Sequence, residues 1–175
     1  MKLKGWKFML SGLVIACGVA VAPASAQMFI NAVTGQPLDL DAGREEERDT
    51  PAVKEFLQTM QNPYNEDPQA LPKGESLFNT ACSGCHGHLG EGKIGPALNH
   101  DGWHYELETD KGLFEVIFDG ADRQMGPQNE FLTQDEILHV MAWVRHLYTG
   151  DPDDATWLTE EQRSSFQPYE EAPSK

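Results

Sequence analysis

The segment Cys82-Ser83-Gly84-Cys85-His86 constrains this chain more than any other stretch of its sequence. Cys-x-x-Cys-His is the attachment signature of a c-type haem. Two cysteines at this spacing bind the two vinyl groups of the porphyrin as thioethers, and the histidine that follows is placed beneath the iron as an axial ligand. We therefore predict one covalently bound haem c, held by Cys82 and Cys85, with His86 as the proximal iron ligand.

Three other uses of a Cys-x-x-Cys pair are possible in principle: a redox pair, half of a zinc site and a structural disulfide. A thioredoxin-like redox pair needs a βαβ context, and no strand pattern flanks this motif. Zinc needs a second pair of ligands at motif spacing, and the one further cysteine, Cys17, lies in a segment that we expect to be removed. Haem attachment is the preferred interpretation.

The first 26 residues have the plan of a secretory signal peptide. Three lysines precede an apolar run over Phe8–Val21, and Ala24-Ser25-Ala26 supplies a small-x-small cleavage site, so we expect cleavage after Ala26. The apolar run is shorter than the roughly 20 residues of a membrane-spanning helix, and we expect an exported, periplasmic protein without membrane insertion. Lipoprotein processing that leaves Cys17 lipidated is the alternative.

The chain without this segment is strongly acidic. The signal peptide carries three of the 13 basic residues and none of the 28 acidic ones, which leaves ten against 28 and a formal charge of −18. A charge of this sign excludes nucleic acid as a partner and favours a basic protein surface that is approached by electrostatic steering. The remaining length fits one domain, and we expect a monomer.

Helical patterns and turn residues predict an all-α protein, because no convincing alternating strand is present. Thr133-x-x-Glu136 is a capping box that opens the strongest amphipathic pattern, which continues to Gly150. Four further helices are expected at 51–61, at 73–81, from Thr109 or Asp110 to Gly120, and after Thr159-x-x-Gln162. We divide the chain into the signal peptide (1–26), an extended acidic arm with a short helix (27–71), a haem domain (72–150) and a C-terminal extension (151–175).

The loop after the haem motif contains Gly95, Pro96 and Leu98, which we expect to line the haem pocket. A backbone carbonyl fixed by the proline is a natural acceptor for the second ring nitrogen of His86, and such a hydrogen bond orients an axial ligand.

The identity of the sixth iron ligand decides whether a haem protein transfers electrons or binds a substrate at the iron. We predict Met125, because it lies in a loop between two expected helices and follows the proximal histidine at a distance that lets it reach the opposite haem face. Met141 belongs to a helical apolar stripe, where methionine usually fills a core. His88 is only two residues from His86, too close to reach the opposite haem face. The remaining histidines are expected at surface or helix-face positions, with ligation by a second histidine as the alternative: His100, His104, His139 and His146.

Several longer stretches carry a family resemblance: Leu71-Pro72-Lys73-Gly74-Glu75, the haem motif with Gly87-His88, residues 90–96, Met125-Gly126-Pro127, and Trp143 to Gly150. With them the chain resembles class I cytochromes c, and its flanks resemble the cytochrome c-L family. The resemblance implies thioethers at Cys82 and Cys85, axial ligands His86 and Met125, and a carrier without enzymatic activity. It also implies PQQ-dependent methanol dehydrogenase as the electron donor and a smaller basic or neutral cytochrome c as the acceptor.

Other functions are kept as alternatives. A generic class I cytochrome c would serve another periplasmic dehydrogenase, including a lanthanide-dependent one, and a small haem peroxidase would need an open sixth position. A calcium-binding module built on the arm carboxylates is less favoured, because their spacing does not follow the calcium-loop pattern.

Overall fold

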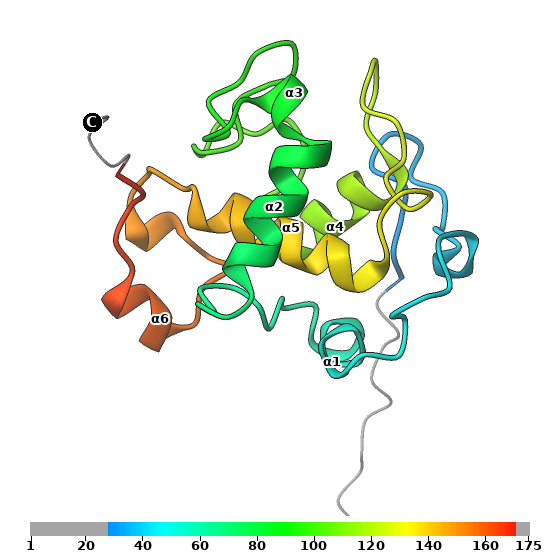
Figure 1. Cartoon of the computed structure of the whole chain (residues 1–175), viewed down its shortest axis with the longest axis horizontal. Helices are drawn as coiled ribbons and strands as arrows, with labels where there is room; N and C mark the ends of the chain where they lie inside the picture. The colour runs from blue at the N-terminus through cyan, green and yellow to red at the C-terminus, as the bar shows by residue number, and fades with distance from the viewer. Residues whose placement is uncertain (1–27, 171–175) are drawn as a thin grey trace, which may run out of the picture.

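The computed structural model of the protein describes residues 28–170 (Figure 1). The predicted signal peptide, with its cleavage site after Ala26 and Cys17, lies outside this range. Within the described residues the fold is all-α, as predicted, and the one strand-like feature there is an isolated bridge between Ile30 and Pro37. The helices are α1 (Pro51–Thr59), α2 (Leu71–Ala81), α3 (Ser83–His86), α4 (Asp110–Asp119), α5 (Gln134–His146) and α6 (Glu160–Ser165), with 3-10 turns η1 (Leu40–Ala42) and η2 (Pro152–Asp154).

The helix starts follow local capping. Threonine side chains accept backbone N–H bonds at the first turns of α1, α4, α5 and α6, and the predicted capping boxes open α5 and α6. The helix α2 begins at Leu71, two residues before the predicted start, because Pro72 is tolerated in a first helical turn. The ends are earlier than predicted: α1 stops at Thr59, where Met60 turns left-handed with φ 58°, and α5 stops at His146.

The centre of the molecule is the crossing of α2 over α5, the most extensive helix pairing (Figure 1). Gly74 lies at the contact, and a Cβ built on it would be 2.2 Å from the backbone oxygen of His139. The absent side chain therefore lets the two backbones meet. Phe78 of α2 and Ile137 and Met141 of α5 are fully buried beside the crossing.

The N-terminal arm is part of this core, although its sequence predicts an extended segment. The ring of Phe29 lies 5.4 Å from that of Phe114 in α4 and 5.9 Å from that of Phe56 in α1. The backbone N–H of Ile30 also donates to Glu115 Oε1 at 2.7 Å. The sequence contains no local signal for this closure, because Phe56 is 27 residues from Phe29 and the α4 partners, Phe114 and Glu115, lie 85 residues from Phe29 and Ile30.

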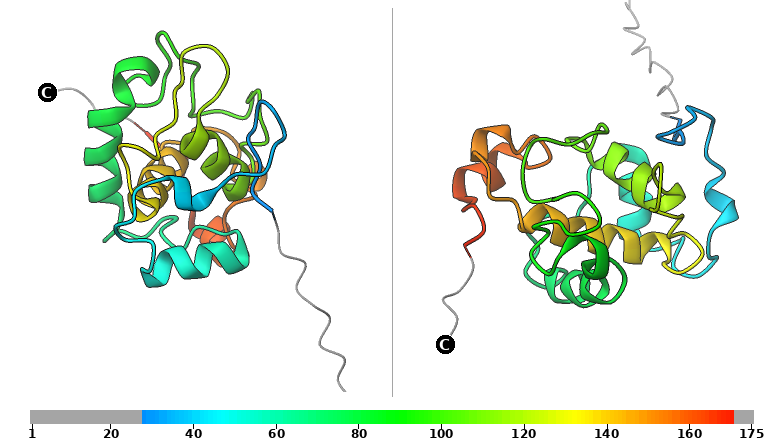
Figure 2. Two further views of the ribbon diagram at one scale, coloured as in Figure 1. Left: turned by 90° about the vertical axis from the view of Figure 1, so that its right-hand side faces the viewer. Right: turned by 90° about the horizontal axis from the view of Figure 1, so that it is seen from above.

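The C-terminal segment builds a second, smaller cluster at the end of α5 (Figure 2). Tyr148 is packed among Trp157, Leu158 and Phe166. The guanidinium of Arg145 lies 4.2 Å from the Trp157 ring and pairs with Asp110 at 3.1 Å, which connects this cluster to the start of α4. No helix between residues 28 and 170 has both the length and the apolar character needed to cross a membrane.

Candidate haem-attachment site

The haem motif forms a single helical turn at the end of α2. The N–H groups of Cys85 and His86 donate to the carbonyl of Cys82 at 3.1 and 3.0 Å. Side chains three and four positions apart on a helix share a face, so this turn presents Cys82, Cys85 and His86 on one side. Cys82 is half-buried and Cys85 is exposed.

Burial distinguishes the two sulfurs. It raises the pKa of the Cys82 thiol to about 11, with a further contribution from nearby Cys85. The Cys82 sulfur is therefore a neutral thiol at neutral pH before attachment, a form that is slow in disulfide exchange.

The loop after the motif closes back on His86. The His86 Nδ1–H donates to the carbonyl of Pro96 at 2.8 Å, which is the predicted hydrogen bond. Gly95 donates its N–H to Cys85, and a Cβ on Gly95 would lie 2.8 Å from His86 Cε1. With Nδ1 engaged, Nε2 is the ring nitrogen that remains for a metal.

The loop that carries Met125 begins where α4 ends. Gly120 has φ +84°, and the N–H of Ala121 donates to the carbonyl of Met125 at 2.9 Å. Met125 is half-buried against the main core cluster. In Figures 1 and 2 this yellow-green loop and the green α3 segment rise on the same side of the molecule, above α4 and α5.

Several of the other methionines and histidines either pack and hydrogen-bond within the protein or lie at its surface. Met141 is fully buried in the core, as predicted, and Met28 is 61% exposed. His88 bonds Asn79, and His100 accepts from Gly102. His139 lies on a helix, α5, but the structure corrects the expectation of a surface position: the residue is buried, its ring stacks on Tyr64, and Nδ1 donates to the carbonyl of Ala70 at 3.1 Å.

The carboxylates of the acidic arm form local ion pairs. Among residues 28–170 no three His, Cys, Asp or Glu side chains come together as a metal-binding group. The arm carboxylates pair locally instead, Glu46 with Arg44 and Asp41 with Arg48.

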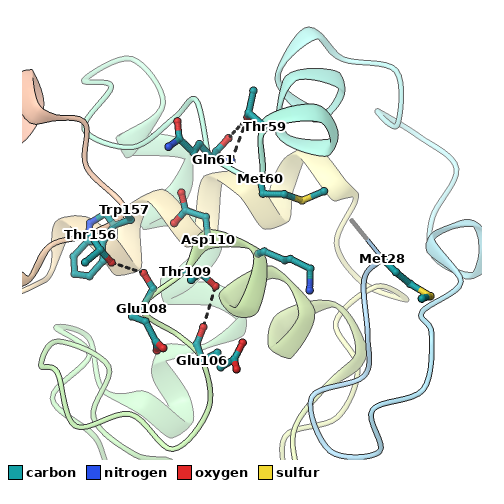
Figure 3. A pocket seen from close by; sticks show the side chains of 11 residues that line it. Met28, Thr59, Met60, Gln61, Glu106, Glu108, Thr109, Asp110, Thr156 and Trp157 are labelled. Carbon is teal, nitrogen blue, oxygen red and sulfur yellow. Dashed lines mark hydrogen bonds between the residues drawn. The ribbon is translucent and has the colours of Figure 1, made fainter. Parts of the chain in front are cut away.

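A pocket of about 610 Å³ opens between α1, α4 and the C-terminal segment (Figure 3). Its lining includes Glu106, Glu108, Asp110, Lys111 and Trp157. No residue of the haem motif or of the Met125 loop contributes to it, so this pocket is separate from the candidate haem site.

The residues of the motif and its loops fit a haem. Two thiols on one helical face, an imidazole with Nε2 available and a methionine thioether form the donor set of a c-type haem. Gly95 leaves the imidazole face clear of a side chain. Half-buried apolar side chains of the surrounding segments offer a porphyrin an apolar environment, namely Leu77, Leu89, Leu98, Ala121 and Met125.

Sequence reasoning missed a hydrogen bond close to Met125, from the Tyr105 hydroxyl to Asp122 Oδ1 at 2.6 Å. No local pattern marks it, because the two residues are 17 positions apart in loops.

Known proteins resemble this chain over most of its length. The family described as cytochrome C oxidase, cbb3-type, subunit III matches residues 69–144. Cytochrome c-L of Methylorubrum extorquens is 53% identical over 172 residues, which cover 93% of this chain and 86% of that protein. The crystal structure of cytochrome cL from the marine methylotroph Methylophaga aminisulfidivorans has a TM-score of 0.78 and 56% identity, covering 83% of this chain and 97% of that one. Cytochrome cL from Hyphomicrobium denitrificans has a TM-score of 0.76 and 49% identity, with coverages of 83% and 88%.

Proposed function

Because this chain belongs to the cytochrome c-L family of class I c-type cytochromes, we propose that it accepts single electrons from a PQQ-dependent methanol dehydrogenase and passes them to a smaller cytochrome c. As a member of this family it carries covalently bound haem c and is an electron carrier, not an enzyme. The observation that supports the specific partner is that the identity of 53% covers 93% of the chain and so includes the flanks outside residues 69–144.

Four residues are proposed to hold the haem. Cys82 and Cys85 form the thioethers, His86 binds the iron through Nε2, and Met125 supplies the second axial ligand. Bound haem supplies a one-electron ferric–ferrous couple, and a methionine ligand raises its potential. The Pro96 carbonyl fixes the tautomer and orientation of His86. With His86 and Met125 both bound to the iron, the haem would have no position left for a substrate.

The quinol form of PQQ carries two electrons, whereas this carrier accepts one at a time. Two oxidised molecules are therefore needed for each alcohol oxidised. The formal charge of −18 after signal removal favours a donor and an acceptor with basic docking surfaces.

Rapid mixing tests this function. The ferric holoprotein is mixed with methanol-reduced dehydrogenase at low ionic strength, with enzyme lacking methanol as the control. We expect haem reduction, at a rate that falls as salt is added. Absence of reduction would reject the dehydrogenase as donor, and a rate independent of salt would reject the steering argument. A lanthanide-dependent dehydrogenase measured in parallel identifies which enzyme class is the partner.

We also propose a periplasmic location and a monomeric state. The signal-like segment before Gln27 supports export, and attachment of haem c normally takes place outside the bacterial cytoplasm, where exported thiols are handled separately from glutathione. The mass of the mature protein tests cleavage after Ala26 against lipidation at Cys17, and its sedimentation velocity tests the monomer.

A further inference from the structure

Two loops that are separate in sequence are joined next to Met125. The Tyr105 hydroxyl donates to Asp122 Oδ1 at 2.6 Å and accepts from the backbone N–H of Asp122 at 3.2 Å. Tyr105 belongs to the segment between the haem motif and α4, and Asp122 lies three residues before Met125. One phenol therefore holds both the side chain and the backbone of the Met125 loop.

The packing of the Tyr105 ring fixes the position of its hydroxyl. Its ring is half-buried against the main core cluster, so the hydroxyl is carried by a packed side chain. The hydrogen bond to Asp122 raises the pKa of Tyr105, so the phenol stays protonated and able to donate throughout the neutral range.

The base of the loop is fixed independently of Tyr105. Gln128 and Asn129 donate their N–H groups to the carbonyls of Ile117 and Phe118 at the end of α4. A Cβ on Gly120 would lie 2.5 Å from the Met125 carbonyl, so the turn closes tightly at its start. These contacts hold the ends of the loop, whereas Tyr105 contacts Asp122, which lies between Gly120 and Met125.

The backbone between Gly120 and Met125 is strained. Arg123 has φ +71°, a left-handed conformation that costs a non-glycine residue stability and persists only where neighbouring contacts enforce it. Asp122, the preceding residue, makes both contacts with Tyr105. The tether is therefore placed where it opposes relaxation of the strained turn.

We propose that Tyr105 and Asp122 are positioning residues that hold the Met125 loop closed, so that the Met125 sulfur stays on the iron. This inference rests on the proposed ligand role of Met125. The thioether is a neutral ligand in a small loop, so its occupancy depends on how rarely the loop opens. A hydrogen bond to a carboxylate at a partly exposed site changes such an equilibrium by about fivefold.

The test measures how readily exogenous imidazole displaces the methionine from the ferric holoprotein. Tyr105→Phe removes the hydroxyl and keeps the ring, and we expect it to bind imidazole about fivefold more tightly than the parent. Asp122→Ala removes the acceptor from the other side and should give a similar increase. The charge-transfer band of methionine-ligated ferric haem, in the far red, is recorded for each variant.

Tyr64→Phe is the matched control. The Tyr64 hydroxyl also donates to a carboxylate, Asp135 Oδ1, at 2.9 Å, but Tyr64 belongs to the segment between α1 and α2 and makes no part of the contact between Tyr105 and Asp122. We expect this variant to lose stability while its imidazole affinity stays within twofold of the parent. The comparison separates a general loss of stability from opening of the loop.

Met125→Ala distinguishes failure of the tether from failure of the ligand assignment. Loss of the far-red band with much tighter imidazole binding supports the ligand role. If Met125→Ala keeps the band and the parental affinity, the ligand assignment and the tether both fail. If Met125→Ala loses the band but Tyr105→Phe and Asp122→Ala bind imidazole as Tyr64→Phe does, the tether alone is rejected.

Discussion

At the scale of single residues, the imidazole of His86 is positioned by backbone groups. The Pro96 carbonyl receives its Nδ1 proton, and Gly95 lies against the ring with no side chain between them. A hydrogen bond from the outer nitrogen makes an imidazole a more basic metal ligand. The geometry of this loop should therefore affect the reduction potential as well as stability.

Gly95→Ala tests this coupling. A Cβ at 2.8 Å from His86 Cε1 forces the ring or the loop to move, which should cost about 1–3 kcal/mol of unfolding free energy. A weakened bond to Pro96 makes the imidazole a poorer donor to ferric iron, so we expect the potential to rise. Redox titration and urea unfolding are the measurements. Gly84→Ala is the control, because a Cβ at Gly84 meets nothing within 4 Å; equal behaviour of the two variants would contradict the argument.

Asp135, at the start of α5, accepts hydrogen bonds from the hydroxyls of Thr50 and Tyr64. Burial alone would raise its pKa, but hydrogen bonds from His139, Thr50 and Tyr64, with the charge of Lys73, hold the pKa of Asp135 well below its usual range. A lowered folded-state pKa adds stability above the unfolded value of about 3.9, and this stability is lost as the pH falls below it.

Asp135→Asn removes the ionised partner of this network. At pH 7 we expect the unfolding free energy to fall by about 1–3 kcal/mol. The difference from the parent should shrink below about pH 4, where the parent carboxylate itself becomes protonated on unfolding. Urea unfolding followed by circular dichroism at pH 7, 5 and 3.5 measures it, and a difference that stayed constant over this range would contradict the assigned pKa shift.

At the scale of elements, the crossing of α2 and α5 holds the haem motif in place, because α3 continues directly from α2. The distance between the helices at this point is set by Gly74, whose Cα faces the carbonyl of His139. On helix propensity alone glycine is unfavourable there by about 1 kcal/mol relative to alanine. Its presence is explained by packing.

Gly74→Ala should therefore destabilise the protein although it improves the intrinsic helix propensity. We expect a loss of more than about 2 kcal/mol, because a methyl group at 2.2 Å from a backbone oxygen must push the helices apart. Ser76→Ala, on the exposed side of the same helix, is the control and should be neutral or slightly stabilising. Thermal unfolding of both holoproteins measures the difference; a more stable Gly74→Ala protein would refute the close crossing.

At the scale of the whole molecule, the C-terminal extension packs against the end of α5 and is part of the folded domain. It covers Tyr148 with Trp157, Leu158 and Phe166, and Tyr169 donates its N–H to the Tyr148 carbonyl at 2.8 Å. The N-terminal arm covers the other end of the core through Phe29. The haem region is thus stabilised by segments on both sides of it in sequence.

Truncation after Gly150 should remove most of this second cluster and expose Tyr148. Loss of several buried aromatic side chains, each worth about 3–5 kcal/mol, is expected to lower the thermal unfolding midpoint sharply and to cause aggregation. The haem should remain attached, because its thioethers lie in the retained part. Truncation after Glu170 is the control and should leave the midpoint unchanged; equal midpoints for the two truncations would show that the extension contributes nothing.

The sequence by itself determined the helical class, the start of each capped helix and the hydrogen bond between His86 and Pro96, because these features depend on residues within about ten positions of one another. It also supplied the complete donor set proposed for the haem. Only the tertiary structure decided that Phe29 closes onto α4, that His139 is buried, that Gly74 lies at a helix crossing and that Tyr105 holds Asp122. Each of these depends on a contact between distant segments, and such contacts are selected by the packing of the whole core and leave no periodic or local signal in the chain.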